Sequence, residues 1–262
     1  MLRLLQGNAE QIPLADESVD LTVTSPPYDD LRSYNGYEFE FKSVASELFR
    51  VTKQSGVLVW VVGDAIIDGS ESGTSFRQAL YFKEIGFRLH DTMIYQKNSP
   101  AAPDSNRYFQ IFEYMFVFSK GQIKTFNPIE DRKNKWPGSW GTRTMRGKDG
   151  ILIPKGKFVQ TKQYGVRFNI WRYNTGKGFT TKDIIAFGHP AIFPEKLASD
   201  HIRSWSNPGD LVFDPMCGSG TTLKMAKQLG RNGIGMDISR KYAELSAKRL
   251  IGVQLPMFEE MT

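Results

Sequence analysis

The chain has 262 residues, of which 40% are hydrophobic and 24% charged, as in a globular protein, and this length fits one large α/β domain with an insertion or two small domains. The net charge is +6, but residues 122–182 contain 14 Lys and Arg against 3 Asp and Glu, so this segment carries +11 and the remainder −5. We expect a cytoplasmic protein with no membrane partner, because the longest apolar run in the predicted strands, residues 57–62, is too short to cross a bilayer and the amino terminus shows no cleavable leader.

Cysteine and histidine usage argues against a disulfide and against a metal site. Cys217 is the only cysteine, so no disulfide can form within the chain and no cysteine-based zinc site is available. His90, His189 and His201 are scattered without the spacing of metal ligands. We therefore predict no metal.

Residues 1–121 alternate predicted strands and helices. Strands are expected at residues 2–5, 19–24, 56–64, 88–96 and 111–119, and helices at 42–53 and 74–85. The run at 56–64 is almost entirely apolar, which is typical of a strand buried on both faces of a parallel sheet. This alternation predicts an α/β fold.

A short motif, Ser25-Pro26-Pro27-Tyr28, follows the strand at 19–24, at the end where open α/β sheets place their chemistry. The two prolines donate no backbone hydrogen bond, so the carbonyl groups of Ser25 and Pro26 are free to accept one, and Tyr28 offers a ring face for stacking. These groups suit a planar ligand that carries an amino group. The alternative is a surface turn in which Tyr28 merely packs.

The region 122–182 has few apolar runs, many glycines and most of the excess positive charge. We predict that it is an irregular inserted module with a polyanionic partner, on which Trp136 and Trp140 stack or wedge. The alternative is a solvated basic surface with the tryptophans in a small core. The candidate nucleic-acid contacts are Arg132, Lys133, Arg143, Arg146 and Lys148, together with Arg32 in the loop at 29–37.

Residues 183–262 contain the most regular unit of the chain. Its expected elements are a helix at 194–205, a strand at 211–214, a helix from Thr221 to Leu229, a strand at 233–237 and a helix at 240–250. The first strand, the second helix and the second strand form a βαβ unit with a glycine-rich first turn.

That glycine-rich turn predicts a cofactor with a nucleoside end. Gly218 and Gly220 let the backbone approach a ligand closely, and the helix that follows directs its free N–H groups toward it. Asp237 is 17 residues beyond Gly220, about where a carboxylate binds ribose hydroxyls. Asp214 would repel a pyrophosphate but favour an ammonium group, so S-adenosyl-L-methionine fits better than a dinucleotide. The alternative is a glycine-rich connection within some other Rossmann-like unit.

Over nearly its whole length, the chain resembles the β-class amino-DNA methyltransferases. Ser25-Pro26-Pro27-Tyr28 matches the family's motif IV, which binds the target base, and residues 214–220 match its motif I, which binds the cofactor. Asn8 resembles the motif III position near the adenine of the cofactor. Residues 189–196 resemble motif X, which closes over its methionine end.

The resemblance implies a Rossmann-like S-adenosylmethionine-dependent methyltransferase fold with a circularly permuted motif order and a seven-stranded, mostly parallel sheet. It divides the chain into a catalytic half at 1–121, an inserted target recognition region at 122–182 and a cofactor-binding half at 183–262. The strand ending at Asp214 is expected beside the strand ending at Thr24, at the topological switch point. The implied catalytic residues are Ser25, Pro26, Pro27 and Tyr28. The implied cofactor-binding residues are Asn8, Ala9, His189, Phe193, Pro194, Asp214, Pro215, Cys217, Gly218, Gly220, Thr221, Thr222, Asp237 and Ile238.

The implied reaction transfers a methyl group from S-adenosyl-L-methionine to the exocyclic amino group of a flipped-out base. Hydrogen bonds from that amine to the Ser25 side chain and the Pro26 carbonyl would draw the nitrogen toward tetrahedral geometry and free its lone pair. Methylation at cytosine C5 is excluded, because it needs a nucleophilic cysteine and Cys217 lies in the cofactor loop. In the family a leading serine is associated with cytosine N4, which we predict as the target. Adenine N6 is the alternative.

Double-stranded DNA is the expected partner, and the sequence leaves open a homodimer and a cognate restriction endonuclease. The rival hypotheses are an RNA or protein-glutamine methyltransferase, a small-molecule Rossmann enzyme, and a catalytically silent nucleic-acid-binding protein. The permuted order and the basic insertion argue against the first of these. The presence of Ser25, Tyr28, Asp214 and Asp237 together argues against the last.

Overall fold

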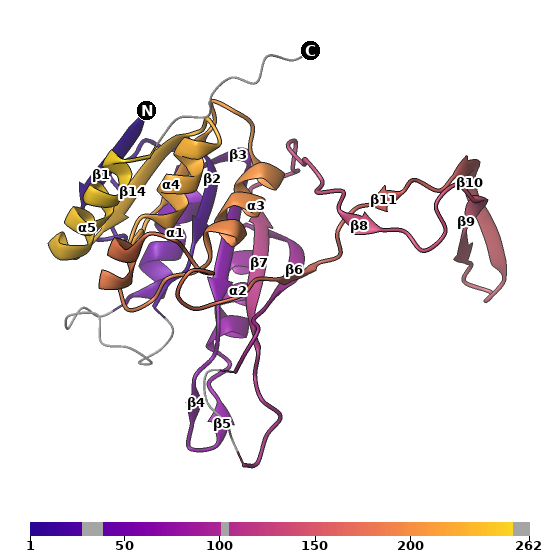
Figure 1. The fold of residues 1–262 in the computed structure, drawn as a ribbon, viewed down its shortest axis with the longest axis horizontal. Helices are drawn as coiled ribbons and strands as arrows, with labels where there is room; N and C mark the ends of the chain where they lie inside the picture. The colour runs from indigo at the N-terminus through magenta and orange to yellow at the C-terminus, as the bar shows by residue number, and fades with distance from the viewer. Residues whose placement is uncertain (28–38, 101–104, 254–262) are drawn as a thin grey trace. The chain divides into compact units, whose positions relative to one another are not determined.

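The computed structural model describes residues 1–27, 39–100 and 105–253 (Figure 1). The chain divides into two compact units, of which the first comprises Met1–Asn127 and Asn169–Thr262 and the second Pro128–Phe168. The predicted insertion at 122–182 is therefore broader than the second unit, because its flanking residues pack with the first. No helix in the described part of the chain is long and apolar enough to span a membrane.

The first unit is built on an eight-stranded sheet in the order β1-β14-β13-β2-β3-β7-β6-β12. Its strands are β1 (Leu2–Gln6), β2 (Val19–Thr24), β3 (Thr52–Val62), β6 (Arg88–Gln96), β7 (Phe112–Ser119), β12 (Ile170–Arg172), β13 (Leu211–Asp214) and β14 (Asn232–Asp237). Within this sheet β7 alone runs antiparallel to its neighbours, and every other pair is parallel. The predicted mostly parallel α/β fold is confirmed.

The sheet has one strand more than the seven predicted. The additional edge strand, β12, pairs in parallel with β6 and places Ile170 opposite Ile94. The prediction missed it because three residues are too few to show a periodicity, and the segment was assigned to the irregular insertion. Trp171 at the centre of β12 is only 6% exposed, so burial of its ring fixes this segment to the first unit.

Strands β13 and β2 are neighbours, as expected, although they lie at opposite ends of the chain. Val212 lies opposite Leu21, and Phe213 lies opposite Thr22. The chain continues from β13 through helix α4 (Thr221–Gln228) to β14 on one side, and from β2 through α1 (Phe41–Val51) to β3 on the other. The connections diverge between β13 and β2, and such a switch point opens a crevice at the carboxyl ends of the strands.

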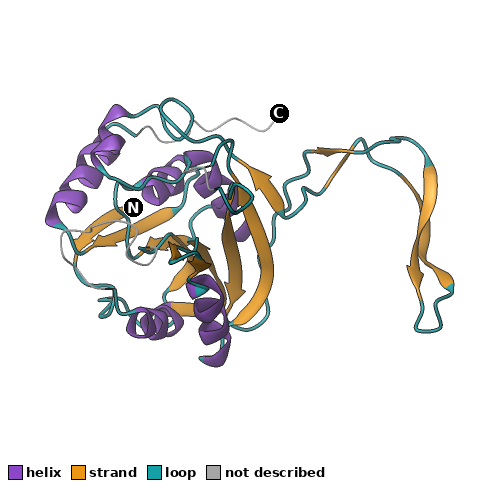
Figure 2. Ribbon diagram, turned by 90° about the horizontal axis from the view of Figure 1, so that it is seen from below, coloured by secondary structure: helices purple, strands orange, loops and turns teal. Residues whose placement is uncertain are grey.

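Helices lie on both sides of the sheet (Figure 2). Besides α1 and α4 they are α2 (Thr74–Glu84), α3 (Glu195–Trp205) and α5 (Arg240–Ile251), with a 3-10 helix η1 (Ile184–Gly188) and a small hairpin of β4 (Ile66–Ile67) and β5 (Ser70–Glu71). Leu48 of α1 and Phe82 of α2 belong to the larger apolar core, whereas Leu223 of α4 and Leu250 of α5 belong to a second cluster. Both faces of the sheet are thus covered by amphipathic helices.

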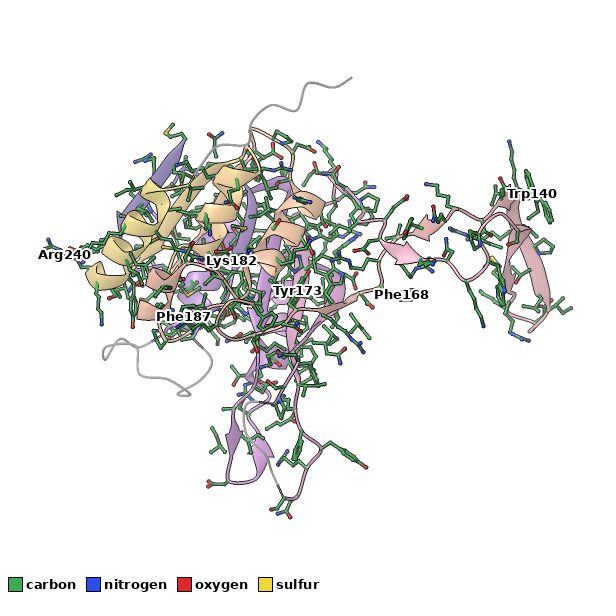
Figure 3. The ribbon with its side chains drawn as sticks, in the orientation of Figure 1. Trp140, Phe168, Tyr173, Lys182, Phe187 and Arg240 are labelled. Carbon is green, nitrogen blue, oxygen red and sulfur yellow. The ribbon has the colours of Figure 1, made fainter. Side chains whose placement is uncertain are left out.

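The second unit consists of two antiparallel ribbons. Strand β8 (Arg132–Lys133) pairs with β11 (Tyr164–Gly165), and β9 (Trp140–Arg146) pairs with β10 (Leu152–Gln160). The structure describes every residue of Pro128–Phe168, and none of them is buried. Trp136 and Trp140 are 67% and 63% exposed, so these tryptophans do not form a small core (Figure 3 labels Trp140). An isolated ribbon of this kind is marginally stable in water and suits a surface that binds something else.

Candidate active site

A cavity of about 550 Å³ lies within the first unit, a volume inside the roughly 300–1,000 Å³ range of ligand pockets. Much of its wall comes from residues at or just beyond the carboxyl ends of β1, β2, β6, β13 and β14. Glu113 near the start of β7 and residues between Thr175 and Phe193 add to it. The cavity therefore spans the switch point between β13 and β2.

Most of the predicted site residues line this cavity. They are Asn8, Ala9, Ser25, Pro26, Pro27, His189, Phe193, Pro215, Cys217, Gly218, Thr221, Asp237 and Ile238. Four others, Pro194, Asp214, Gly220 and Thr222, are not part of its wall. Tyr28 and Arg32 lie outside the described residues. Residues of the two motifs, far apart in the chain, thus share one cavity.

The loop after β13 approaches the opposite wall at Gly218. This residue has a φ of 49°, and a Cβ added there would lie 2.8 Å from Nε2 of His189. A side chain at position 218 would therefore collide with the imidazole as well as strain the backbone. The absence of a Cβ keeps the loop and the His189 segment close together on this part of the cavity wall.

The Asp237 carboxylate is fixed at the wall by two backbone amides. Its Oδ2 accepts from the Gly218 N–H at 2.8 Å, and its Oδ1 accepts from the Ser239 N–H at 2.9 Å. Burial raises the pKa of Asp237 above its ordinary value, although both hydrogen bonds oppose that shift. Each carboxylate oxygen has a further lone pair, so Asp237 can accept hydrogen bonds from a ligand's hydroxyl groups.

Asp214 is directed into the protein rather than toward the cavity. It is 2% exposed, and its Oδ1 accepts from the Thr24 hydroxyl at 2.8 Å and from the Met216 N–H at 3.2 Å. Burial raises its pKa to about 6, against the lowering effect of these hydrogen bonds. Asp214 is not among the residues that line the cavity, so its predicted contact with an ammonium group stays a prediction. Its carboxylate ties the end of β13 to the residue that precedes Ser25.

The other three predicted residues that do not line the cavity lie next to elements that do; they are Pro194, Gly220 and Thr222. Thr222 of α4 donates from its hydroxyl to the Val23 carbonyl at 3.1 Å, which joins α4 to β2. Gly220 precedes α4 with a φ of 76°, and Pro194 precedes α3. Their positions set the directions of the two helices that border the site.

The Cys217 thiol lines the cavity but is not suited to nucleophilic attack. The residue is 5% exposed, and burial raises the pKa of its thiol well above the ordinary value. The nearby charges of Asp214 and Asp237 raise it further. Since the thiolate is the reactive form, Cys217 is a weak nucleophile in this site. No group of three His, Cys, Asp or Glu residues that could hold a metal ion occurs in the part of the chain that the structure describes.

The His189 ring is held between the cofactor loop and helix α5. Its Nδ1 lies 2.6 Å from the Ala191 carbonyl oxygen, and its ring centroid lies 4.3 Å from that of Tyr242 in an edge-on arrangement. Both aromatic residues line the cavity. They give this end of the cavity a flat, largely apolar wall.

Beneath the loop, a partly buried charge network links it to the first residue of α3, Glu195, and to Asp183 before η1. Arg249 of α5 donates to the Ser219 carbonyl at 3.0 Å, to the Thr221 hydroxyl at 2.9 Å and to the Glu195 carboxylate at 2.5 Å. Lys224 of α4 binds both Glu195 and Asp183 at 2.7 Å. No pattern in the sequence marks this network, because Arg249 and Lys224 are ordinary helix residues until tertiary packing buries them.

A second set of wall residues was also missed. Tyr95 at the end of β6 and Lys97 just beyond it line the cavity together with Glu113 and Thr180. Lys97 Nζ and Glu113 Oε1 are 2.9 Å apart. Lys97 and Glu113 could have been predicted as site residues, because both are charged and lie near the ends of two adjacent predicted strands. Thr180 was assigned to the insertion.

The described members of the predicted nucleic-acid contacts lie in the second unit. Arg132 donates to the Val166 carbonyl at 2.9 Å and to Asn134 at 2.8 Å, and Arg146 donates to the Gly150 carbonyl at 2.7 Å. Arg143 lies directly opposite Lys155 in the β9–β10 ribbon. The other described members are Lys133, in β8, and Lys148, in the turn between β9 and β10.

Comparisons with known proteins agree on one family. A family model described as DNA methylase, for N6 and N4 methyltransferases, matches residues 19–248. The orphan methyltransferase M.BamHII of Bacillus amyloliquefaciens is 60% identical over 241 residues, which are 90% of either chain. Among solved structures, the cytosine-N4-specific PvuII DNA methyltransferase superposes with a TM-score of 0.68 at 20% identity, over 100% of this chain and 88% of its own. TTHA0409 of Thermus thermophilus, solved in complex with S-adenosyl-L-methionine, gives 0.65 at 24% identity over 100% of both chains.

Proposed function

The chain belongs to the DNA methylase family of N6 and N4 amino-group methyltransferases, and from this premise we propose that it methylates N4 of cytosine in double-stranded DNA. The observation that carries the proposal is the shared cavity. Ser25 and Pro26, from the carboxyl end of β2, line the same space as Gly218 and Asp237. A base and a cofactor can therefore meet across the switch point.

The cavity fits S-adenosyl-L-methionine, which supplies an electrophilic methyl group on a positively charged sulfur. Gly218 lines the cavity, and its missing Cβ lets the His189 ring pack against the loop there. Asp237 would accept the ribose hydroxyls, and Ile238 would flank the adenine. We assign Asn8, which also lines the cavity, to the adenine end of the cofactor; its Oδ1 accepts from the Glu10 N–H at 3.0 Å. His189 and Phe193 would cover the methionine end.

Ser25 and Pro26 orient the methyl-accepting amine. The Ser25 hydroxyl and the Pro26 carbonyl accept its two hydrogens, which weakens conjugation of the nitrogen with the base and directs its lone pair into the cavity. This geometry is stiff, because Pro26 and Pro27 restrict the backbone and Asp214 holds Thr24. The base leaves the duplex to reach them, and Tyr28 stacks on it there.

Two features favour cytosine over adenine. The motif begins with a serine, which in this family is associated with N4 of cytosine. The PvuII methyltransferase, whose fold is similar, is named as cytosine-N4-specific. Transfer to N6 of adenine is the alternative within the same mechanism.

The second unit is proposed as the DNA-binding surface. Pro128–Phe168 holds 10 Lys and Arg against 3 Asp and Glu, a net charge of +7. Like charges directly opposite across a ribbon repel each other, and a DNA phosphate beside Arg143 and Lys155 would relieve that repulsion. A two-stranded ribbon also fits the major groove. Arg132, Lys133, Arg146 and Lys148 belong to the same basic unit, and Arg32 is proposed to add a contact from the first unit.

The name of the 60% identical relative, an orphan methyltransferase, favours a solitary enzyme over one with a cognate restriction endonuclease.

The test is nucleoside mass spectrometry of DNA from a methylation-deficient host that expresses the protein. We expect N4-methylcytosine from the wild type and none from Ser25→Ala, with the variant still binding S-adenosyl-L-methionine. N6-methyladenine in its place would overturn the choice of base. A Ser25→Ala variant as active as the wild type would overturn the role of the motif.

A further inference from the structure

We propose that Tyr95 and the Lys97–Glu113 pair form the far wall of the target-base site and discriminate cytosine from adenine. This inference rests on the proposed function. It assigns a specificity role to residues that lie outside both the Ser-Pro-Pro-Tyr motif and the glycine-rich turn. The argument for this specificity role starts from the positions at which β2, β6 and β7 begin or end.

The end of β6 lies at the same edge of the sheet as Ser25. Strand β6 is antiparallel to β7, β7 is antiparallel to β3, and β3 is parallel to β2, so β6 and β2 point the same way. Tyr95 lies directly opposite Glu113 in the β6–β7 ladder, and Lys97 is two residues beyond Tyr95. Residues two apart in an extended chain, and residues directly opposite on paired strands, face the same side. All three line the cavity that Ser25 lines.

The spacing between the two walls suits a planar base. Three strand-to-strand steps separate β2 from β6, which is roughly 14 Å between their backbones. The wall formed by Tyr95, Lys97 and Glu113 is thus placed to contact the edge of a base whose amino group faces Ser25.

The Tyr95 hydroxyl is a donor that lacks an acceptor. The residue is 2% exposed, and its hydroxyl makes no hydrogen bond with any residue that the structure describes. Leaving a buried hydroxyl unpaired costs about 1–3 kcal/mol, and because Tyr95 lines the cavity, we take an acceptor on the ligand to be the missing partner. The ring is held in place by Tyr173, whose centroid is 5.9 Å away and whose own hydroxyl donates to Asp200 at 2.8 Å.

The Lys97–Glu113 pair supplies a second donor without adding net charge. Nζ and Oε1 are 2.9 Å apart, and the side chains are only 19% and 18% exposed. An ammonium group has three N–H donors, so Lys97 can bind Glu113 and a ligand acceptor together. Glu113 also keeps the wall neutral overall, which suits an uncharged base.

Two donors on one wall match cytosine better than adenine. Beside its amino group, cytosine presents two acceptors, N3 and O2, to the Tyr95 hydroxyl and the Lys97 ammonium. Adenine presents N1, but it has a C–H group where cytosine has O2. With adenine bound, one of the two donors would stay unpaired in a closed site. Enzymes whose site hydrogen-bonds a substrate group reject an analogue without that group by up to about 10⁴-fold.

The test compares Tyr95→Phe with the matched control Tyr114→Phe. Tyr114 follows Glu113 in β7, does not line the cavity, and packs against Phe76 of α2 with 5.2 Å between ring centroids. Both substitutions remove one hydroxyl from neighbouring strands. Purified full-length proteins are incubated with unmethylated DNA, and initial rates of N4-methylcytosine and N6-methyladenine formation are measured by mass spectrometry. S-adenosyl-L-methionine affinity is measured in parallel.

We expect Tyr95→Phe to lower kcat/KM for N4-methylcytosine formation 10- to 100-fold and to raise the share of N6-methyladenine, with unchanged cofactor affinity. Tyr114→Phe should match the wild type in all three measurements. A Tyr95→Phe enzyme that binds the cofactor and keeps the wild-type rate and product ratio would overturn the inference. A wild-type enzyme that forms no N4-methylcytosine would contradict the proposed function itself, before any variant is compared.

Discussion

Arg249→Met tests whether the partly buried charge network supports the cofactor loop. The Arg249 side chain is 1% exposed and binds Asp183, Glu195, Ser219 and Thr221. Methionine preserves length and helix propensity but removes every one of these hydrogen bonds. Asp183 and Glu195 would then share Lys224 as their remaining cation in this network.

The expected effect is large because a buried partner is removed. Breaking a fully buried ion pair costs about 3–5 kcal/mol, but Asp183 and Glu195 are 32% and 22% exposed and keep Lys224, so we expect a loss of about 2–3 kcal/mol. For a unit of this size each kcal/mol lowers Tm by roughly 2–4 °C, so we expect a fall of roughly 4–12 °C. The loop atoms that Arg249 holds belong to Ser219 and Thr221, which line the cavity, so affinity for S-adenosyl-L-methionine should also fall about tenfold, or ~1.4 kcal/mol.

The matched control is Arg240→Met on the same helix. Arg240 is 79% exposed and pairs with Glu244 at 2.9 Å, and Figure 3 shows its side chain pointing away from α5. Such surface pairs contribute little, so Tm should change by no more than about 2 °C. Scanning calorimetry gives Tm, and titration calorimetry gives the cofactor affinity. Equal Tm values and equal affinities for the two variants would refute the role assigned to Arg249.

Two further predictions concern Asp214 and the basic ribbon. The folded pKa of Asp214, about 6, lies above its unfolded value, so its stabilising contribution is fully present below about pH 4 and is lost as pH rises through 6. Asp214→Asn keeps an oxygen that accepts from Thr24 and Met216. Its free energy of unfolding in urea should therefore exceed that of the wild type by roughly 2–3 kcal/mol at pH 8 and about equal it at pH 4. A difference that stays constant between these two pH values would refute this. Arg143→Ala should weaken binding to all DNA sequences alike and lower the slope of log affinity against log salt by about 1, as measured by fluorescence anisotropy with Arg240→Ala as control. An unchanged slope would remove Arg143 from the phosphate contacts.

The sequence predicted the core of the fold because the signals there are strong and local. The continuous apolar run at 56–62 lies in β3, and the glycine-rich turn with Asp237 beyond it marks the β13–α4–β14 unit. The neighbouring positions of β13 and β2 came from the family resemblance rather than from any local pattern. β12 was missed, because its three residues gain their order only from pairing with β6.

Site residues whose role depends on local backbone geometry were predicted from the sequence. Those whose role depends on tertiary packing were missed. Gly218 has a signature in the chain itself, because a tight turn with a positive φ that packs closely against a neighbouring segment favours glycine. Arg249 and Tyr95 have none, since their roles follow from burial and from neighbours distant in sequence. For Asp214 the strand-end position suggested a ligand contact, and the structure adds a second role, because its carboxylate accepts a hydrogen bond from Thr24.

The central claim is that one cavity brings an amine of DNA to the methyl donor. The most direct test incubates purified protein with unmethylated duplex DNA and S-adenosyl-L-methionine carrying a trideuterated methyl group, and then analyses the nucleosides by mass spectrometry. The account predicts trideuterated N4-methylcytosine from the wild type and its loss in Ser25→Ala. Label at cytosine C5, or DNA that stays unlabelled while the protein binds both DNA and cofactor, would contradict it.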